Sequence, residues 1–394
     1  MRPIPITAFT ITSALGRGVC ATLDAISQAR SGLAPCRFET VDLDTFVGEV
    51  DGVDAVALPA ELARFDCRNN RAAELGLAQD GFAQAVDAAA RRHGAARVGV
   101  FIGTSTAGIH EAELAYRRRD AASGALPPGF DYRHTHNTFS VAAYVRARLG
   151  LAGPCAAVST ACSSSAKAFA SAARYMEAGL IDAAVVGGVD TLCLTTLYGF
   201  NSLDLLSREP CRPYDARRDG ISIGEAAAFF LLERAAGGGS VALLGTGETS
   251  DAYHMSAPHP EGRGAREAMQ SALAKARIDA QLVDYVNLHG TGTPSNDAAE
   301  DKAMHAVFPG GVACNSTKGF TGHTLGAAGA VEAAVCLLAM CEGLVPPSPG
   351  TRSVDASLRA HYETRGFRRP VDVAMSNSFG FGGTNCSLVF GRLA

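Results

Sequence analysis

Tryptophan is absent from this chain of 394 residues, and aromatic residues make up only 7% of it. Small residues, above all alanine and glycine, are abundant instead, and hydrophobic residues reach 47%. Such a composition favours helices packed closely on sheets over a β-sandwich. The length is too great for one small domain, and it predicts two packed halves with a sizeable core.

A strong excess of charge of either sign is also missing. The net charge is -4, so we expect no broad basic surface of the kind that binds nucleic acid. No run of residues approaches the ~20 uninterrupted apolar positions of a membrane span. The first residues lack the architecture of a signal peptide. Together these absences predict a soluble cytoplasmic protein.

Metal-binding and disulfide patterns are lacking among the cysteines. The chain has 11 of them, but no Cys-x-x-Cys pair and no Cys/His cluster at ligand spacing. We therefore predict neither a disulfide framework nor a metal site. Several cysteines lie in apolar segments, where a free cysteine behaves as a small hydrophobic residue; these are Cys155, Cys193, Cys314, Cys336 and Cys386.

Segments with strand and helix periodicity alternate along most of the chain. Strands are predicted at 98–102, 155–160, 183–186, 241–245, 285–288 and 387–390, and helices at 83–92, 163–177, 263–276 and 328–340. The run Gly237-Gly238-Gly239 is a predicted seam, which divides the chain into halves at 1–239 and 240–394. The stretch 117–138, rich in charge, glycine and proline, is a predicted surface excursion.

The first candidate catalytic residue is Cys162, in the segment VSTACSSS between a predicted strand and a predicted helix. Serine hydroxyls on the first helical turn are expected to satisfy free backbone N–H groups. The positive end of the helix dipole would favour thiolate over thiol. On this motif alone, Cys162 is either such a nucleophile or a buried structural cysteine.

Another candidate is His289, which ends a predicted strand in the segment NLHGTGTP. Small residues after it would leave room for a substrate, although a lone histidine is more often a core residue. Thr291 and Thr293 could donate hydrogen bonds to an amide-bearing arm or cap a turn.

A third segment, NSTKGFTGHTLGAAGAVE, carries Lys318, His323 and Glu332. We interpret Lys318 as a charge held near His323. Glu332 lies in an otherwise apolar helix start and needs a partner, for which Lys318 is the obvious candidate. A fourth segment, SNSFGFGGTN, carries Phe379 and Phe381. It is either a mobile loop with bulky rings or a tight turn before the final strand.

These four segments, in this order, resemble the elongating β-ketoacyl-[acyl-carrier-protein] synthases of the thiolase superfamily, a group that includes the ketosynthase domains of polyketide synthases. Further matching stretches are CRPYD at 211–215, RDG at 218–220, GE at 224–225 and DAYHM at 251–255. The resemblance covers nearly the whole chain and is strongest from about Gly150 onward. It implies a thiolase-like α/β fold of two stacked halves in a five-layer α-β-α-β-α arrangement. It also implies a homodimer as the usual form, with a heterodimer with a chain-length factor as the alternative.

The resemblance implies a mechanism as well. Cys162 would take an acyl group from a carrier-protein thioester, and malonyl-carrier protein would then bind with its carbonyl between His289 and His323. Carbon dioxide leaves, so the site needs donors aimed at an oxyanion rather than a strong base. Lys318 would hold His323, and Glu332 would organise that pair.

Other roles follow from the same resemblance. The backbone N–H groups of Cys162 and Phe381 would form a second oxyanion hole, and Phe381, with Phe379 beside it, would act as a gate. Thr291, Thr293 and Ser256 would bind the phosphopantetheine arm, which belongs to the carrier protein. No metal or redox cofactor of the protein itself is implied.

An acidic carrier protein would need basic residues near the tunnel mouth. Arg64, Arg68 and Arg71 have a spacing that puts them on one helix face, and Arg208 lies where the family often has a basic residue. Each of these arginines could also be an ordinary solvated surface residue.

The sequence departs from the family at several positions. Ala226 stands where glycine is usual, Ser256 where threonine is frequent, and the stretch from Gly103 to Gly150 departs most. The segment SAPHP at 256–260 resembles synthases that build polyenes in specialised metabolism, while ordinary fatty-acid elongation stays open.

Four rival interpretations differ in their residues. A non-catalytic chain-length factor would have lost the nucleophile that Cys162 provides. A degradative thiolase would need a second cysteine as base, for which Cys386 is the nearest candidate. A chalcone-synthase-like enzyme would place asparagine at the second histidine. A Cys-His hydrolase would need neither Lys318 nor the phenylalanine loop.

Overall fold

The computed structural model describes residues 1–234 and 240–393. The predicted seam at Gly237-Gly238-Gly239 lies outside these residues, so the boundary between 239 and 240 stays a prediction. The helices are α1 (Gly18–Ser27), α2 (Arg68–Leu77), α3 (Phe82–His93), α4 (Ile109–Arg117), α5 (Ser140–Arg148), α6 (Ser164–Glu177), α7 (Leu194–Ser202), α8 (Arg263–Ala276), α9 (Pro294–Val307), α10 (Lys318–Thr321) and α11 (Ala328–Glu342).

The strands build one sheet path through the molecule, in the order β12-β11-β15-β16-β10-β1-β9-β7-β5-β6. Its members are β1 (Ile4–Ser13), β5 (Val98–Gly103), β6 (Cys155–Val158), β7 (Ala183–Asp190), β9 (Ala226–Glu233), β10 (Val241–Ser250), β11 (Tyr285–Asn287), β12 (Ala313–Asn315), β15 (Val373–Gly380) and β16 (Thr384–Arg392). Strand β1 pairs with both β9 and β10 and so joins an N-terminal set of strands to a C-terminal set. The short strands are β2 (Gly16–Arg17), β3 (Ala34–Pro35), β4 (Phe46–Gly48), β8 (Ile223–Gly224), β13 (Leu344–Val345) and β14 (Phe367–Arg368).

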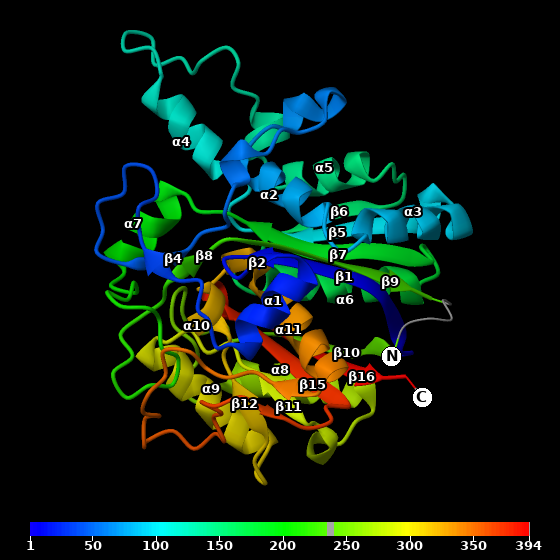
Figure 1. The fold of residues 1–394 in the computed structure, drawn as a ribbon, viewed down its shortest axis with the longest axis vertical. Coiled ribbons are helices and arrows are strands. Elements are labelled where there is room, and N and C mark those ends of the chain that lie inside the picture. The colour runs from blue at the N-terminus through cyan, green and yellow to red at the C-terminus, as the bar shows by residue number, and fades with distance from the viewer. Residues whose placement is uncertain (235–239, 394) are drawn as a thin grey trace.

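Helices cover both faces of the two strand sets, which gives the five layers that the resemblance implied (Figure 1). Helices α2, α3 and α5 lie on the outer face of the N-terminal set, and α8 and α9 on the outer side of the C-terminal set. Helices α6 and α11 lie between the sets and contact each other. Glycine makes this contact close, because a Cβ on Gly329 would meet the backbone nitrogen of Ala166 at 2.7 Å.

Helix α11 is apolar on nearly all sides, as a helix surrounded by protein should be. The stretch Leu325–Glu342 is long and apolar enough to cross a membrane, but 89% of it is buried within the fold. Its composition therefore reflects its place in the middle layer.

The predicted strands and helices are present, but β6 and β11 end earlier than predicted, at Val158 and Asn287 rather than at 160 and 288. Other strands extend further than predicted. Strand β7 continues to Asp190, β10 to Ser250, and β16 runs from Thr384 to Arg392. Antiparallel pairing extends β10 and β16 over residues outside the predicted strands, such as Thr249 against Asn385.

The predicted surface excursion projects from the top of the molecule beyond α4 (Figure 1). It begins where α4 ends at Arg117 and includes a single π-helical turn, η4 (Tyr132–His136). Large aromatic side chains on and beside it are exposed, namely Tyr116 at 57%, Tyr132 at 57% and Phe139 at 41%. These apolar surfaces lack protein cover within the described residues.

Candidate active site

Cys162 lies at a sharp turn between β6 and α6, as predicted. The residue before it, Ala161, has a left-handed backbone conformation with φ of 50°. The hydroxyls of Ser163 and Ser164 donate hydrogen bonds back to the carbonyls of Thr160 and Ala161, at 2.9 and 2.6 Å. The Ser164 hydroxyl accepts the backbone N–H of Thr160 at 2.8 Å, and the Ser165 hydroxyl accepts that of Ala330 at 2.9 Å. Serines thus satisfy backbone N–H groups as expected, but in the turn and on α11, because no side chain among the described residues caps α6 itself.

The thiol of Cys162 is buried, and burial raises its pKa to about 11. The charge of Lys318 and the backbone N–H of Phe381 act in the opposite direction without overcoming it. The prediction that the helix dipole keeps Cys162 as a thiolate is thus wrong, because loss of hydration outweighs the dipole here.

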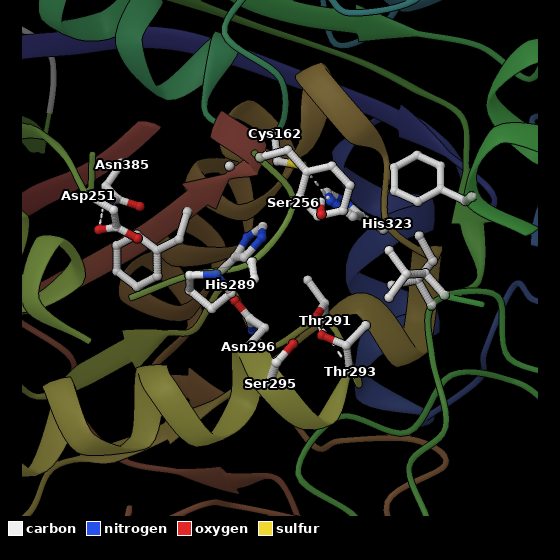
Figure 2. A pocket seen from close by; sticks show the side chains of 18 residues that line it. Cys162, Asp251, Ser256, His289, Thr291, Thr293, Ser295, Asn296, His323 and Asn385 are labelled. Carbon is white, nitrogen blue, oxygen red and sulfur yellow. Dashed lines mark hydrogen bonds between the residues drawn. The ribbon is translucent and has the colours of Figure 1, made fainter. Parts of the chain in front are cut away.

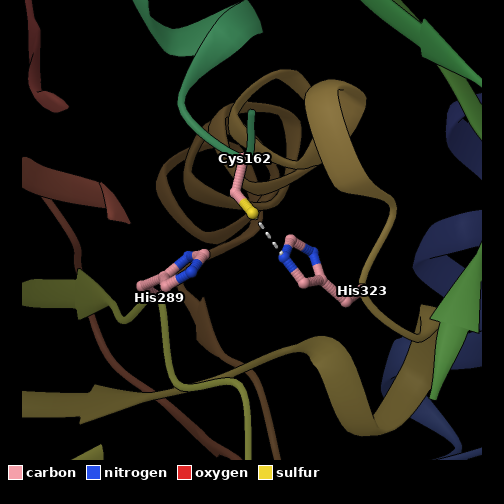
Figure 3. A group of neighbouring side chains, drawn as sticks. All are labelled: Cys162, His289 and His323. Atoms are coloured by element: carbon pink, nitrogen blue, oxygen red, sulfur yellow. Dashed lines mark hydrogen bonds between the residues drawn. The ribbon is translucent and has the colours of Figure 1, made fainter. Parts of the chain in front are cut away.

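His323 approaches this sulfur directly, with its Nε2 3.0 Å from the Sγ of Cys162 (Figure 3). Its other ring nitrogen, Nδ1, accepts the backbone N–H of Leu325 at 3.3 Å. A neutral ring that accepts at Nδ1 carries its proton on Nε2. Burial, aided by the charge of Lys318, holds the pKa of His323 well below its usual range, so the ring is neutral near pH 7.

His289 lies beside His323 at the end of β11, and the two ring centres are 5.3 Å apart. The ammonium of Lys318 lies 3.4 Å from the Nδ1 of His289, which leaves Nε2 to carry the ring proton. Burial first, and then the charge of Lys318, holds the pKa of His289 well below its usual range. The site thus has two neutral imidazoles, each with an N–H on Nε2.

The side chain of Lys318 contacts His289. The prediction that it holds His323 is therefore wrong. Its ammonium donates to the carbonyl of His289 and forms a buried ion pair with Glu332. Burial raises the pKa of Glu332 to about 7, although Lys318 pulls it down. The predicted pairing of Lys318 with Glu332 is present.

Glu300, on α9, is a site residue that the motifs did not reveal. Its buried carboxylate accepts the backbone N–H groups of His289 at 2.8 Å and of Gly290 at 2.7 Å. Burial raises the pKa of Glu300 to about 7. The sequence did contain a signal for this contact. Glu300 lies 11 residues after the candidate His289, on the helix that follows it.

The phenylalanine loop closes the other side of the sulfur. Phe379 is the second-last residue of β15, is 8% exposed, and has its ring centre 6.1 Å from that of His289. Phe381 begins a short turn with two left-handed glycines, Gly382 at φ 76° and Gly383 at φ 69°. Its ring packs against Phe200 of α7 with centres 5.5 Å apart, a contact that the sequence did not predict.

A cavity with about 590 Å³ of empty space, part of it open to solvent, leads to these groups (Figure 2). The predicted arm-binding residues line it, and the hydroxyls of Thr291 and Thr293 lie 2.9 Å apart. Ser256 lies in a half-buried loop at the same cavity. The cavity is lined by Cys162, Phe200, Leu205, Ile221, Asp251, Ser256, Ala257, Pro258, His289, Thr291, Thr293, Ser295, Asn296, His323, Phe379, Gly380, Phe381 and Asn385.

The three catalytic candidates also form a set that could bind a metal ion. The ligand atoms of Cys162, His289 and His323 all lie within 4.8 Å of one another. Thiolate and imidazole ligands suit zinc, but binding would consume the thiol and both imidazole N–H sites. These atoms can act either as metal ligands or as a thiol nucleophile with two imidazole hydrogen-bond donors. A resident metal is not needed to explain their arrangement.

The arginines predicted to bind a carrier protein do not share one helix face. Arg64 is exposed in a separate 3-10 helix, whereas Arg68 and Arg71 lie on α2. The prediction for Arg68 is wrong, because it is 3% exposed and its guanidinium binds Glu225 at 2.7 Å. Arg71 pairs with Asp66 at 2.6 Å, and Arg208 is exposed.

Cys386, the candidate second cysteine of a thiolase, does not lie at this cavity. It is fully buried within β16, and burial raises its pKa above the usual range. The structure thus provides no second thiol beside Cys162 among the residues that line the cavity.

Comparison with known proteins gives a consistent result. The family described as "Beta-ketoacyl synthase, N-terminal domain" matches residues 1–237, and its C-terminal counterpart matches residues 241–352. The 3-oxoacyl-[acyl-carrier-protein] synthase 2 of Vibrio cholerae is 32% identical over 100% of this chain and 99% of that protein. Nodulation protein E of Rhizobium meliloti is 36% identical over 75% of this chain and 76% of its own length.

Solved structures with the same fold include ketosynthases that form complexes. The ketosynthase ApeO from Xenorhabdus doucetiae, in complex with its chain length factor ApeC, has a TM-score of 0.90 and 38% identity, over 99% of this chain and 98% of that one. The ishigamide ketosynthase/chain length factor has a TM-score of 0.89 and 25% identity over the full length of both chains.

Proposed function

This chain belongs to the β-ketoacyl synthase family, and from that premise we propose how its own residues perform the family's reaction. The reaction is a decarboxylative Claisen condensation, in which an acyl group on the enzyme joins malonyl-[acyl-carrier protein] and carbon dioxide leaves. The observation that carries the assignment is the convergence of one thiol and two neutral imidazole N–H groups at the end of one cavity.

The first half-reaction is acyl transfer to Cys162. The sulfur attacks the thioester of an acyl-carrier protein, a new C–S bond forms, and the carrier thiol leaves with the proton that Cys162 loses. The backbone N–H of Phe381, which already lies at this sulfur, and that of Cys162 would hold the developing oxyanion. Because the resting thiol is neutral, its proton has to leave during the attack.

The second half-reaction depends on the two imidazoles. The malonyl thioester carbonyl would accept both Nε2–H groups, so that the electron pair left by carbon dioxide rests on an enolate oxygen held by His289 and His323. The enolate carbon then attacks acyl-Cys162, the C–S bond breaks, and the thiolate regains a proton. Lys318 fixes His289 and places a positive charge behind the site.

The hydroxyl-bearing wall of the cavity suits a carrier-bound substrate. Thr291 and Thr293 present hydroxyls along its wall, where an amide-bearing phosphopantetheine arm would accept or donate hydrogen bonds. The arm belongs to the carrier protein, and the enzyme itself uses no cofactor. Arg263 is exposed and donates to the carbonyl of Asp251, a residue of the cavity wall, at 2.9 Å, so it suits an acidic carrier. Arg208 is exposed in a separate hollow that Asp44, Asp204 and Asp219 also line.

A chain-length-factor-type partner fits the free edge of the sheet. Strand β6 is the last strand of the sheet path, pairs with β5 alone among the described strands, and is half-buried along its length. An unpaired apolar edge is a site for another chain. The exposed aromatics of the excursion add apolar surface. The similarity to ApeO, determined with its chain length factor, favours a heterodimer over a homodimer. The SAPHP segment at 256–260 favours a specialised polyene pathway over fatty-acid synthesis.

Intact mass spectrometry tests the proposal. The purified chain, alone and co-expressed with a chain-length-factor homologue, is mixed with a panel of acyl-carrier proteins and then with malonyl-carrier protein. We expect an acyl adduct on Cys162 that converts to β-ketoacyl-carrier protein, and none with Cys162→Ala. If Cys162 never acylates with any donor in either form, the catalytic assignment is wrong. Condensation by the chain alone as a dimer would favour the homodimer.

A further inference from the structure

Helix α7 has no capping side chain of its own. It begins at Leu194 after Cys193, whose side chain makes no cap hydrogen bond. Instead the carboxylate of Glu113, on α4, accepts the backbone N–H of Leu194 at 3.0 Å and that of Thr195 at 2.7 Å. It also accepts the hydroxyl of Thr195 at 2.6 Å. A carboxylate at this end satisfies free N–H groups and interacts well with the helix dipole.

A cap supplied by a different helix does more than stabilise α7, because it fixes where α7 begins relative to α4. The other end of α7 carries Phe200, which lines the catalytic cavity. The Phe200 ring lies 5.5 Å from that of Phe381, with an interplanar angle of 39°. The gate residue therefore rests on a helix whose position Glu113 sets.

Helix α4 is in turn anchored to the catalytic loops. The buried carboxylate of Asp190 accepts the backbone N–H of Ser105 at 2.9 Å and that of Thr106 at 2.9 Å, just before α4 begins. The same carboxylate accepts the backbone N–H of Gly326, three residues after His323. Glu113 thus holds α7 against a helix that is itself fixed to the histidine loop.

We infer that Glu113 is a positioning residue for the gate: by capping α7 from α4, it holds Phe200 where Phe381 can rest on it. With this support, Phe381 keeps malonyl-carrier protein out until Cys162 is acylated. Without it, Phe381 loses its resting place and malonyl groups are decarboxylated before any acyl group is present. The product would be acetyl-carrier protein and carbon dioxide, with a proton taken up from solvent. This inference rests on the proposed function.

The test compares two rates in the same protein. One is the release of carbon dioxide from malonyl-carrier protein without an acyl donor, and the other is condensation with a fixed acyl donor. We expect Glu113→Ala to raise the ratio of uncoupled decarboxylation to condensation about five- to tenfold, the size of effect that follows loss of a helix cap. Glu113→Asp, which keeps a carboxylate, should restore much of the normal ratio.

Two further variants keep the test decisive. Glu111→Gln is the matched control, since Glu111 lies on the same helix and makes no hydrogen bond to α7 among the described residues. Phe200→Leu removes the ring contact without touching the cap, and it should raise the same ratio even if Glu113→Ala fails to fold. A purely structural role would lower both rates together and leave the ratio unchanged, which would overturn the inference. If the unmodified enzyme neither acylates nor condenses, the proposed function fails first.

Discussion

The two sides of the Cys162 sulfur are built differently. On the histidine side, His289, His323 and Lys318 are at most 2% exposed, and each ring has its Nδ1 occupied by a named donor. On the gate side, Phe381 is half-buried and is followed by two glycines in a left-handed conformation. One side has a single arrangement available to it, whereas the other has a backbone that turns easily.

The contacts that hold the gate are also fewer and more exposed. The backbone N–H of Gly382 bonds to the carbonyl of Met255 at 2.8 Å, and that of Asp251 bonds to the carbonyl of Gly383 at 2.8 Å. Met255 itself is 78% exposed. The chemistry needs donors already in place when charge develops, while substrate exchange needs a segment that moves. The histidine side meets the first requirement, and the gate side meets the second.

Removing an imidazole should give the largest effect and should affect one half-reaction only. We expect His289→Ala and His323→Ala each to lower condensation ~10²–10³-fold, as loss of an oxyanion donor does. Acylation of Cys162 should persist, because its oxyanion is held by backbone N–H groups on the gate side. Rapid-quench measurement of each half-reaction separates the two. An equal loss in acylation would contradict the division of roles.

The rigidity of the histidine side can be tested through Lys318. Lys318→Met leaves the carboxylate of Glu332 buried without its partner, and we expect a loss of about 3 kcal/mol in the free energy of unfolding. The double variant Lys318→Met, Glu332→Leu removes both charges and should recover most of that loss without recovering activity. Urea unfolding measures the first effect and condensation rates the second. Equal stability of single and double variants would mean that the pair is not coupled.

Local patterns predicted the strands and helices and the motifs of Cys162, His289 and His323, whereas the five-layer fold followed from the resemblance to a known family. Cys162, His289 and His323 each follow a recognisable strand or glycine-rich turn, and the structure brings the three together. What the sequence could not predict depends on residues far apart in the chain. Arg68 looked like a surface residue, but its partner Glu225 is 157 residues away.

The partner of Lys318 illustrates the same limit at short range. A separation of five residues suggested that Lys318 holds His323. Lys318 is instead the first residue of the short helix α10, and its ammonium contacts His289, which lies 29 residues earlier in the chain. The pKa of Cys162 was misjudged for a related reason. The helix dipole can be inferred from the motif, whereas the burial that opposes it comes from the loops packed around the sulfur.

On the gate side, a smaller effect should follow from loosening one loop contact. The Asp251 carboxylate accepts the side-chain N–H of Asn385 at 2.9 Å and the backbone N–H of His259 at 2.9 Å. Asp251→Asn weakens both and should raise the KM for malonyl-carrier protein about fivefold, with kcat changed less than about twofold. Asp279→Asn, at an exposed turn away from the cavity, is the matched control. A fall in kcat alone would mean that Asp251 acts on the chemical step rather than on binding of malonyl-carrier protein.

The smallest effect is expected from a change of pH, because neither His289 nor His323 should titrate near neutral pH. Because burial holds the pKa values of His289 and His323 well below the usual range, both rings should stay neutral as the pH falls from 8 to 6. Nitrogen-15 NMR of histidine-labelled protein should show two Nε2–H tautomers that do not shift across this range, assigned with His289→Asn and His323→Asn. An imidazolium signal near pH 6.5 would mean that water reaches the rings. The contrast in rigidity between the two sides of the sulfur would then disappear.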